Sequence, residues 1–383
     1  MSEISAGETP TSSTSAGGTP AADTTVSVSA ASDGGWRPDI LGAGYTQRVL
    51  DLGPDPDGEG PDRESPDGEG PGAKGLAGKG AVEAVLVRRS PQPGEVTTGA
   101  VLYVHGFADY FFQTDLADFF AGHGLAFYAL DLRKCGRARR PGQTAHYVSD
   151  LRRYDEELEQ ALKLVAAAHP GQPVIVAAHS TGGLVVPLWL HRRRRKIGAS
   201  KTAPVTGLVL NSPWLDLQGS WLVRGPVTQA MRLLAKARPL REMKLRPGVY
   251  GQTLHVSGTG EWEFDTSLKP LHGFPVTFGW INAIRRGQAR LHRGIDTGVP
   301  VLVLRSAKSM AGYEYSPECD RCDLVLDARQ IGRWTDAGAL GDQVTHVVVD
   351  GARHDVFLSL PDVRKRAYDR LGTWLRDHEL PAS

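Results

Sequence analysis

The chain has 383 residues, with 44 Lys and Arg against 43 Asp and Glu, and a formal net charge of +1 at pH 7. This balance argues against a protein built to bind nucleic acid or an anionic membrane through its overall charge. Three cysteines cannot all pair with one another, which argues against a disulfide-built secreted scaffold. No run of about 18 apolar residues predicts a spanning helix. The N-terminus lacks a secretory signal, so a cytoplasmic protein is expected.

Two stretches have a biased composition. Residues 1–35 are rich in Ser, Thr, Ala and Gly with no aromatic residue, which predicts a disordered tail. Residues 53–80 carry the acidic hexamer PDGEGP twice, which is typical of a solvated linker. Apolar segments flank this linker at Thr46–Leu52 and Ala81–Arg89, and the second of them alternates apolar with charged or small residues. A hairpin with a lengthened, low-complexity loop is therefore expected, and not a domain boundary.

From Gly99 onward, short apolar runs alternate with helical periodicity. The helical period is clearest over 149–168, where apolar residues step by three and four after a Ser/Asp capping signal. Strands that are apolar on both faces and alternate with helices predict an α/β fold, with a mostly parallel sheet covered on both faces. The runs are Ala100–Gly106, Leu125–Leu132, Pro173–Ser180, Thr206–Ser212, Val299–Ser306 and Val344–Gly351.

The alternation stops over residues 212–298. This segment contains no strand-like core run and is too long for an ordinary connection. It carries half of the chain's eight Trp residues. We expect a mostly helical insertion that caps the sheet, and a core composed of residues 36–211 and 299–383.

The sharpest motif is the string AHSTGG at Ala178–Gly183, directly after an apolar run and before a helical stretch. A tight strand-to-helix turn strains the serine backbone and leaves room only for small residues two positions away, here Ala178 and Gly182. The usual pattern is G-x-S-x-G, so Ala178 is a modest departure. We predict that Ser180 is a nucleophile; the alternative is a serine that caps a helix.

Two further features suit such a serine. His105-Gly106-Phe107 ends a strand, and a tight turn there can aim the Phe107 amide at an oxyanion, with the Thr181 amide as second donor. The alternative is a structural His-Gly turn. His354 follows the last strand run on a loop and is predicted to be the general base, with a surface histidine as the alternative.

The order Ser180, acid, His354 matches the α/β-hydrolase order. The segments VLYVHGFADYFFQTDLADFFAGHGLAFYALDLRKCGRA, VIVAAHSTGGLV and VLVLRS…GARHDVFL resemble the lysophospholipase and monoglyceride-lipase-like branch of that superfamily, which is grouped with serine aminopeptidase-like hydrolases. The resemblance spans about residues 82–380, without most of the insertion. It implies an eight-stranded sheet, a helical cap over the site, ester hydrolysis through an acyl-enzyme, and no metal or cofactor.

The resemblance also bears on the acid, which follows the strand at Val299–Ser306 in a D-x-V-V type string. Here an insertion precedes that string, and Asp323 fits it best, with the role of orienting and stabilising His354. The rival acids in the same stretch are Asp327, Asp320 and Glu318.

The remaining cysteine motif is C-D-R-C at Cys319 and Cys322. A tetrahedral zinc site needs four ligands, and the only other cysteine is Cys135, so no metal is expected. The role of the pair stays open.

Two classes of function follow. The first is a serine hydrolase that cleaves a carboxylic ester such as a lysophospholipid or monoacylglycerol, because an aromatic-rich insertion suits an acyl chain. An aminopeptidase is the alternative of the same fold, since Glu261, Glu263 and Asp265 form an acidic cluster that could hold an ammonium group. The second is a ligand-binding protein without turnover. A small or lipid-like ester is the expected partner, and the oligomeric state stays open.

Overall fold

The computed structural model describes residues 34–58, 80–198, 204–217 and 232–380. The predicted tail at 1–35 lies outside the described residues except for its last two glycines, and most of the predicted linker at 53–80 also lies outside them.

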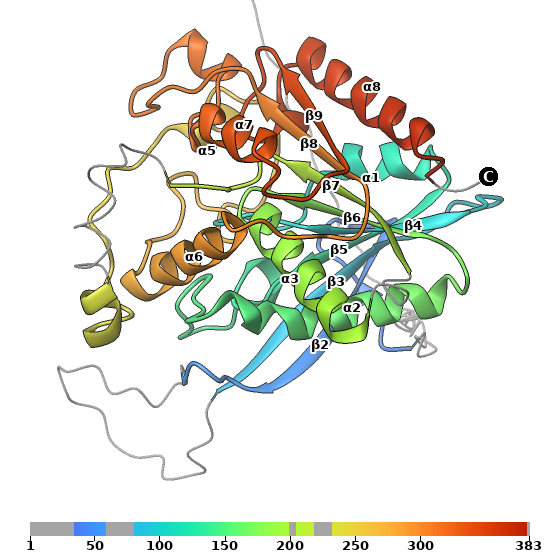
Figure 1. Cartoon of the computed structure of the whole chain (residues 1–383), viewed down its shortest axis with the longest axis horizontal. Helices are drawn as coiled ribbons and strands as arrows, with labels where there is room; N and C mark the ends of the chain where they lie inside the picture. The colour runs from blue at the N-terminus through green and yellow to red at the C-terminus, as the bar shows by residue number, and fades with distance from the viewer. Residues whose placement is uncertain (1–33, 59–79, 199–203, 218–231, 381–383) are drawn as a thin grey trace, which may run out of the picture. The chain divides into compact units, whose positions relative to one another are not determined.

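A nine-stranded sheet forms the centre of the fold (Figure 1). Its order is β1-β2-β3-β5-β4-β6-β7-β8-β9. The neighbours β1/β2, β2/β3 and β3/β5 pair antiparallel. All pairs from β5/β4 to β8/β9 are parallel. This confirms the predicted α/β class. The strands are β1 (Arg37–Pro38), β2 (Tyr45–Pro54), β3 (Ala81–Arg89), β4 (Gly99–Val104), β5 (Leu125–Asp131), β6 (Val174–His179), β7 (Val205–Asn211), β8 (Val301–Ser306) and β9 (Val344–Val349).

The structure has one strand more than the eight expected. The additional strand, β1, contains only two residues, both exposed, which pair with Gln47 and Thr46 of β2. So short an element shows no period in the sequence. The other eight strands coincide with the eight apolar segments identified above.

The predicted hairpin is confirmed. β2 and β3 pair antiparallel from Tyr45 opposite Arg89 to Pro54 opposite Ala81, with an irregularity after Asp51. The last residue of β2, Pro54, and the first residue of β3, Ala81, are therefore paired where the chain enters and leaves the linker.

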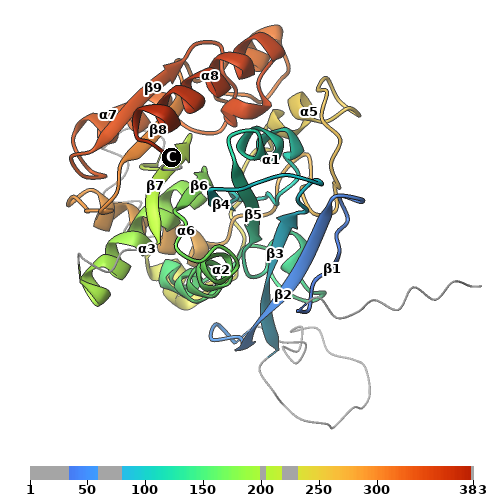
Figure 2. The same cartoon turned by 90° about the vertical axis from the view of Figure 1, so that its right-hand side faces the viewer.

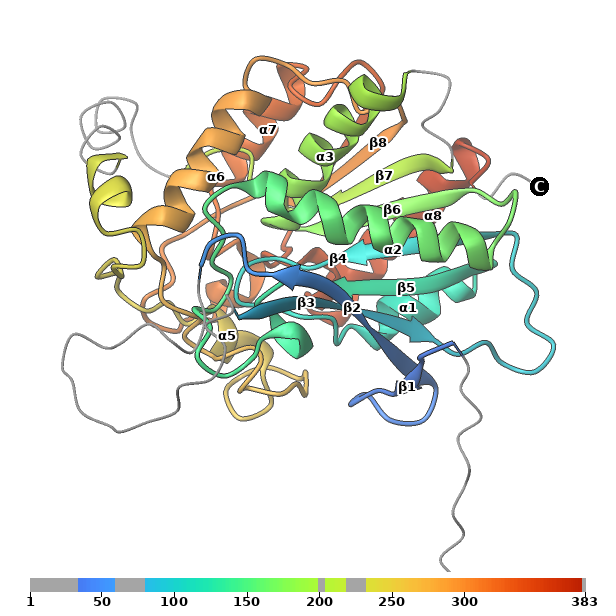
Figure 3. The ribbon, with the colours of Figure 1, turned by 90° about the horizontal axis from the view of Figure 1, so that it is seen from below.

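Helices cover both faces of the sheet. α1 and α8 lie on one side and α2 and α3 on the other (Figure 2 and Figure 3). Within the described ranges, every helix is too short or too polar to cross a bilayer. The helices are α1 (Thr114–Ala121), α2 (Asp155–Ala168), α3 (Gly182–Ile197), α5 (Tyr250–Leu254), α6 (Phe278–Leu291), α7 (Ala328–Asp336) and α8 (Pro361–Asp377).

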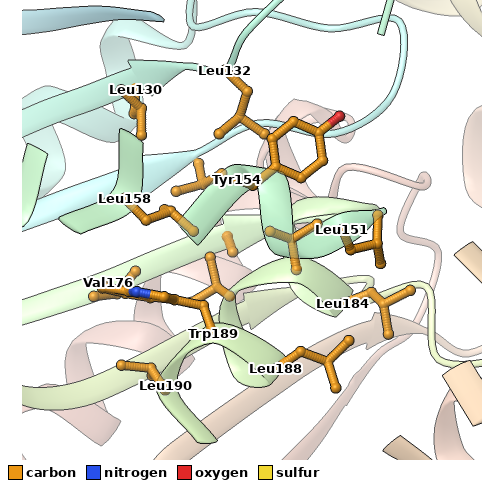
Figure 4. Close-up of a cluster of buried hydrophobic side chains, with 14 of the residues drawn as sticks. Leu130, Leu132, Leu151, Tyr154, Leu158, Val176, Leu184, Leu188, Trp189 and Leu190 are labelled. Atoms are coloured by element: carbon orange, nitrogen blue, oxygen red, sulfur yellow. The ribbon is translucent and has the colours of Figure 1, made fainter. Parts of the chain in front are cut away.

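The sheet separates two apolar cores, because alternate residues of each strand point to opposite faces. Leu102 and Val104 of β4 pack with α2 and α3, whereas Val101 and Tyr103 pack with α1 and α8. Figure 4 shows part of the first core, where Leu158 of α2 and side chains of α3 meet.

The connection from β7 to β8 contains α5, α6 and a helical stretch at 232–237. The sequence predicts a mostly helical insertion, but loops make up much of its described part. Proline and glycine account for this difference, since Pro247, Gly248, Pro270 and Gly273 interrupt the segment.

Candidate active site

Ser180 occupies the sharp turn between β6 and α3 (Figure 1). Its φ is +51°, a left-handed conformation that is costly for a non-glycine residue. A Cβ on Gly182 would lie 2.6 Å from the carbonyl oxygen of His105, so only glycine fits there. The small residues of the motif therefore allow α3 to start directly against β4 and hold the Ser180 hydroxyl at the carboxyl edge of the sheet.

His354 contacts this hydroxyl from the loop after β9. Its Nε2 lies 2.9 Å from Oγ of Ser180, and its side chain is 2% exposed. The ring also lies beside Tyr250 of α5, with 5.6 Å between the ring centroids. The imidazole is thus held between the sheet edge and the β7–β8 connection.

Asp323 completes the chain of contacts. Its Oδ2 lies 2.9 Å from Nδ1 of His354, and its side chain is fully buried. Its Oδ1 accepts backbone N–H bonds from Val325 and Leu326 at 2.8 and 2.7 Å. When Nδ1 of His354 donates to this carboxylate, Nε2 is left free to accept the serine proton.

The other candidate acids have different partners. Asp320 pairs with Arg353 at 2.7 Å and accepts a hydrogen bond from Tyr315. Asp327 caps α7 by accepting the Arg329 amide. Glu318 is exposed, and a hydrogen bond from Ser316 lowers its pKa. Of the four acids, the structure brings only Asp323 to His354.

The two predicted oxyanion donors lie beside the nucleophile. Thr181 follows the nucleophile at the N-terminus of α3. Phe107 follows Gly106, and a Cβ added to Gly106 would lie 2.9 Å from Cβ of Ser180. Among the described residues, neither the Phe107 amide nor the Thr181 amide donates to a protein acceptor. Both amides are therefore available as donors to a substrate oxygen that becomes negatively charged next to Ser180.

A buried charged group next to this site was not foreseen from the sequence. Asp109 accepts a 2.6 Å bond from Nζ of Lys269 with one oxygen, and its other oxygen lies 3.3 Å from Nδ1 of His179. Burial alone would raise the pKa of Asp109, but the Lys269 ammonium and the imidazole hold it well below its usual range. The His179 ring lies 4.9 Å from that of His354.

Asp109 and His179 could have been found from the sequence, because each lies within two residues of a predicted site residue. Asp109 follows Phe107 by two positions, and His179 directly precedes Ser180. No local pattern marks Lys269, which lies about 160 residues further along the chain, in the β7–β8 connection. Its ammonium joins that connection to the loop after β4.

Aromatic side chains pack against Phe107, which carries one of the predicted oxyanion donors. Trp280 of α6 lies against Phe107, with 4.3 Å between the ring centroids, and Trp214 lies 5.7 Å from Trp280. On its other side, Phe107 contacts His146 at 4.9 Å. The connection between β7 and β8 therefore places the buried ring of Trp280 against Phe107 and the half-buried Trp214 next to Ser180, whose carbonyl accepts the Trp214 amide at 2.9 Å.

No group of three or more His, Cys, Asp or Glu side chains with metal-site geometry occurs in the described part of the chain. The three cysteines are free thiols, and Cys135 lies 3.1 Å from Nδ1 of His146. Cys319 is buried, and its sulfur accepts the Ser316 amide within a short 3-10 helix.

Comparisons with known proteins agree with this architecture. A soluble variant of monoglyceride lipase from Saccharomyces cerevisiae has a TM-score of 0.58 and 18% identity, over 78% of this chain and 92% of that chain. A carboxyl esterase from Bacillus coagulans has a TM-score of 0.55 and 14% identity, over 77% and 94%. A monoacylglycerol lipase from Paleococcus ferrophilus has a TM-score of 0.52 and 18% identity, over 74% and 96%. These TM-scores show a shared fold.

Curated protein sequences give no significant match. The family described as serine aminopeptidase, S33 matches residues 95–310, which is more than half of the chain. The matched part includes the loop after β4, the turn at Ser180 and the whole β7–β8 connection. The chain therefore belongs to the serine aminopeptidase S33 family and has the α/β-hydrolase fold.

Proposed function

We propose that this protein is a serine hydrolase that cleaves carboxylic esters through an acyl-enzyme. The observation that carries the proposal is the buried chain from Ser180 through His354 to Asp323, with a contact of 2.9 Å at each step. A hydroxyl, an imidazole and a carboxylate in this order are the groups that nucleophilic acyl transfer requires.

In the first half of the reaction, Oγ of Ser180 attacks the ester carbonyl carbon while Nε2 of His354 takes the hydroxyl proton. The carbonyl electron pair moves to the oxygen, which accepts bonds from the Phe107 and Thr181 amides. The electron pair then returns, the bond to the alkoxy oxygen breaks, and His354 gives its proton to the departing alcohol. Asp323 holds the ring and stabilises its positive charge.

In the second half, a water molecule attacks the acyl carbon while His354 takes one of its protons. The new tetrahedral intermediate collapses, the bond to Oγ breaks, and His354 returns the proton to Ser180. The products are one carboxylic acid and one alcohol, and the enzyme is regenerated.

Two half-buried aromatic side chains near the nucleophile, Phe107 and Trp214, support esters with an apolar acyl group, such as monoacylglycerols or lysophospholipids. The Trp214 amide donates to the Ser180 carbonyl at 2.9 Å, and the buried Trp280 packs against both rings. Such surface gains free energy from burying an alkyl chain and offers no counter-charge to an amino group. We propose that the β7–β8 connection is the cap that encloses this chain.

An aminopeptidase is the second candidate, since the family carries that description. A substrate ammonium would need carboxylates that face the nucleophile. Glu261, Glu263 and Asp265 are exposed, and Glu261 pairs with Arg364 on α8. The three acids on which this alternative rested are thus at the outer surface, and one of them is already paired.

The first test is covalent labelling with a fluorophosphonate probe, read by intact mass. We expect one label on the wild type and none on Ser180→Ala or His354→Ala. Ser212→Ala is the matched control, because Ser212 is also buried, has a φ of +44° and follows the neighbouring strand β7. It should label like the wild type.

The second test compares nitrophenyl esters of increasing chain length with aminoacyl nitroanilides on the same sample. Faster turnover of the longer esters would support the proposed substrate class. Faster turnover of the anilides would favour the aminopeptidase. A folded wild type that takes no label would contradict catalysis and leave the ligand-binding alternative.

A further inference from the structure

A cleft whose lining does not include Ser180 opens on the surface, with a volume of about 560 Å³. Its walls come from the segment before α2, from α6 and from residues 232–239. We call it the arginine cleft, because four of its lining side chains are arginines. The lining residues are Tyr147, Ser149, Asp150, Arg152, Arg153, Arg232, Ala235, Lys236, Pro239, Gly279, Asn282 and Arg286.

The elements around this cleft lie side by side: the helical stretch at 232–237 flanks α6 in two views (Figure 1 and Figure 3). Gly279, Asn282 and Arg286 project from one side of α6, at intervals of three and four residues. A Cβ on Gly279 would lie 2.9 Å from the ring of Tyr147, so glycine lets α6 approach this ring closely. The cleft is therefore built on packed secondary structure.

The charges in the cleft are unbalanced. Five cationic side chains line it, and Asp150 is the only carboxylate among the lining residues. Asp150 binds Arg152 at 2.7 Å and Arg286 at 2.5 Å, and Asp57 lies 3.8 Å from Arg153. Even with both carboxylates counted, the local sum is +3, in a chain whose overall net charge is +1.

Two of the four arginines, Arg152 and Arg286, are bound to Asp150 before any ligand binds. Burial would raise the pKa of Asp150, but its bonds to Arg152 and the charge of Arg286 lower it to about 2, so it stays ionised at neutral pH. One carboxylate thus orients two guanidinium groups at the wall of the cleft. Arg232 and Lys236, on the opposite wall, are exposed and form no ion pair with the described residues.

We propose that the arginine cleft binds a phosphate-bearing anion. The planar guanidinium fork matches phosphate oxygens in pairs, and several arginines around one cavity favour more than one negative charge. The volume is that of a small-molecule site, larger than a single phosphate ion needs. The phosphate could belong to a free metabolite or to a lipid headgroup that reaches into the open cleft.

The test measures binding of inorganic phosphate and pyrophosphate to the full chain by calorimetry. A parallel arm measures co-sedimentation with phosphatidylcholine vesicles, with and without phosphatidic acid. The test variants are the double change Arg232→Gln, Lys236→Gln and the single change Arg286→Gln. The matched control is Arg238→Gln, Arg241→Gln, which removes the same charge from exposed residues of the neighbouring segment.

We expect saturable binding of pyrophosphate that is stronger than that of phosphate and weakens with salt. Each test variant should weaken it about tenfold or more, whereas the control should stay within about threefold of the wild type. Sedimentation only with phosphatidic acid vesicles, lost in the same variants, would also support the cleft and assign the phosphate to a lipid.

The proposal is overturned if neither probe binds the folded wild type, or if the control variant loses as much affinity as the test variants. The second result would mean general attraction to a basic surface. Fluorophosphonate labelling of the same variants should match the wild type, which checks folding and keeps this test independent of the proposed ester hydrolysis.

Discussion

Oδ2 of Asp323 lies 2.9 Å from Nδ1 of His354, and both side chains are almost completely buried. The other oxygen of the carboxylate accepts two backbone amides, from Val325 and Leu326. The orientation of the carboxylate is therefore fixed by its own loop, independently of the imidazole. A carboxylate fixed in this way favours the His354 tautomer with the proton on Nδ1 and restricts the orientation of the imidazole ring.

Replacing Asp323 with Asn should reduce kcat for a nitrophenyl ester by about 10⁴-fold. An amide N–H in place of Oδ2 would donate to Nδ1 of His354. The ring proton would then sit on Nε2, and Nε2 could no longer accept the proton of Ser180. Asp327→Asn is the control, because Asn also caps a helix well and α7 should be retained. Equal losses in both variants would remove Asp323 from the proposed role.

Asp320→Asn should lower stability more than chemistry. Asp320 is the carboxylate partner of Arg353, whose side chain is 2% exposed and also donates to the Leu358 carbonyl. Without the negative charge, we expect the free energy of unfolding to fall by about 1–3 kcal/mol, measured by urea titration. Fluorophosphonate labelling of the folded variant should persist, whereas its loss at unchanged stability would make Asp320 part of the site.

Lys269→Met should be strongly destabilising, by about 3–5 kcal/mol, because it leaves the carboxylate of Asp109 buried without its cation. The double variant Lys269→Met, Asp109→Asn should recover much of this loss, since the uncompensated charge is gone. Urea denaturation of the two single variants and the double variant gives the coupling between the pair. Additive effects would contradict a direct ion pair.

The same pair predicts a pH dependence. The pKa of Asp109 is lowered in the folded protein, so its contribution to stability is present above the unfolded pKa of about 3.9 and is lost as the pH falls below it. The stability difference between wild type and Lys269→Met should thus be largest near neutral pH and should shrink in acid. A difference that grows on acidification would show that another group dominates.

Gly182→Ala should disturb the turn that carries Ser180. The added methyl group would lie 2.6 and 2.8 Å from the carbonyl oxygens of His105 and Val104, which are backbone atoms with little freedom to move. We expect a loss of about 1–3 kcal/mol in stability and a clear loss of labelling rate. Gly122→Ala is the control, because its φ is −62° and its nearest contact would be 3.4 Å.

The eight longer strands, the turn at Ser180 and the loop that carries His354 could all be predicted from the sequence. Each is encoded locally, by an apolar run followed within a few residues by a glycine, a small residue or a polar side chain. The choice of Asp323 needed the resemblance as well, because Asp320 and Asp327 lie within four residues and only their hydrogen-bond partners distinguish them.

The long-range contacts could not be predicted. Lys269 and Asp109 are 160 residues apart, and an ion pair of this kind leaves no periodic signal in either segment. The position of β5 between β3 and β4 likewise depends on how helices pack on the sheet. The short β1 is defined only by its pairing with Gln47 and Thr46 of β2, and two residues carry no period.

The register of the β2–β3 hairpin has a practical consequence. Pro54 and Ala81 face each other at its end, so the two chain ends that enter and leave the PDGEGP linker are neighbours in the sheet. Because the cost of closing a loop grows slowly with its length, we expect changes in linker length to leave the strands in place. New termini could be opened there, or another domain inserted, while the sheet edge that carries Ser180 and His354 keeps its geometry.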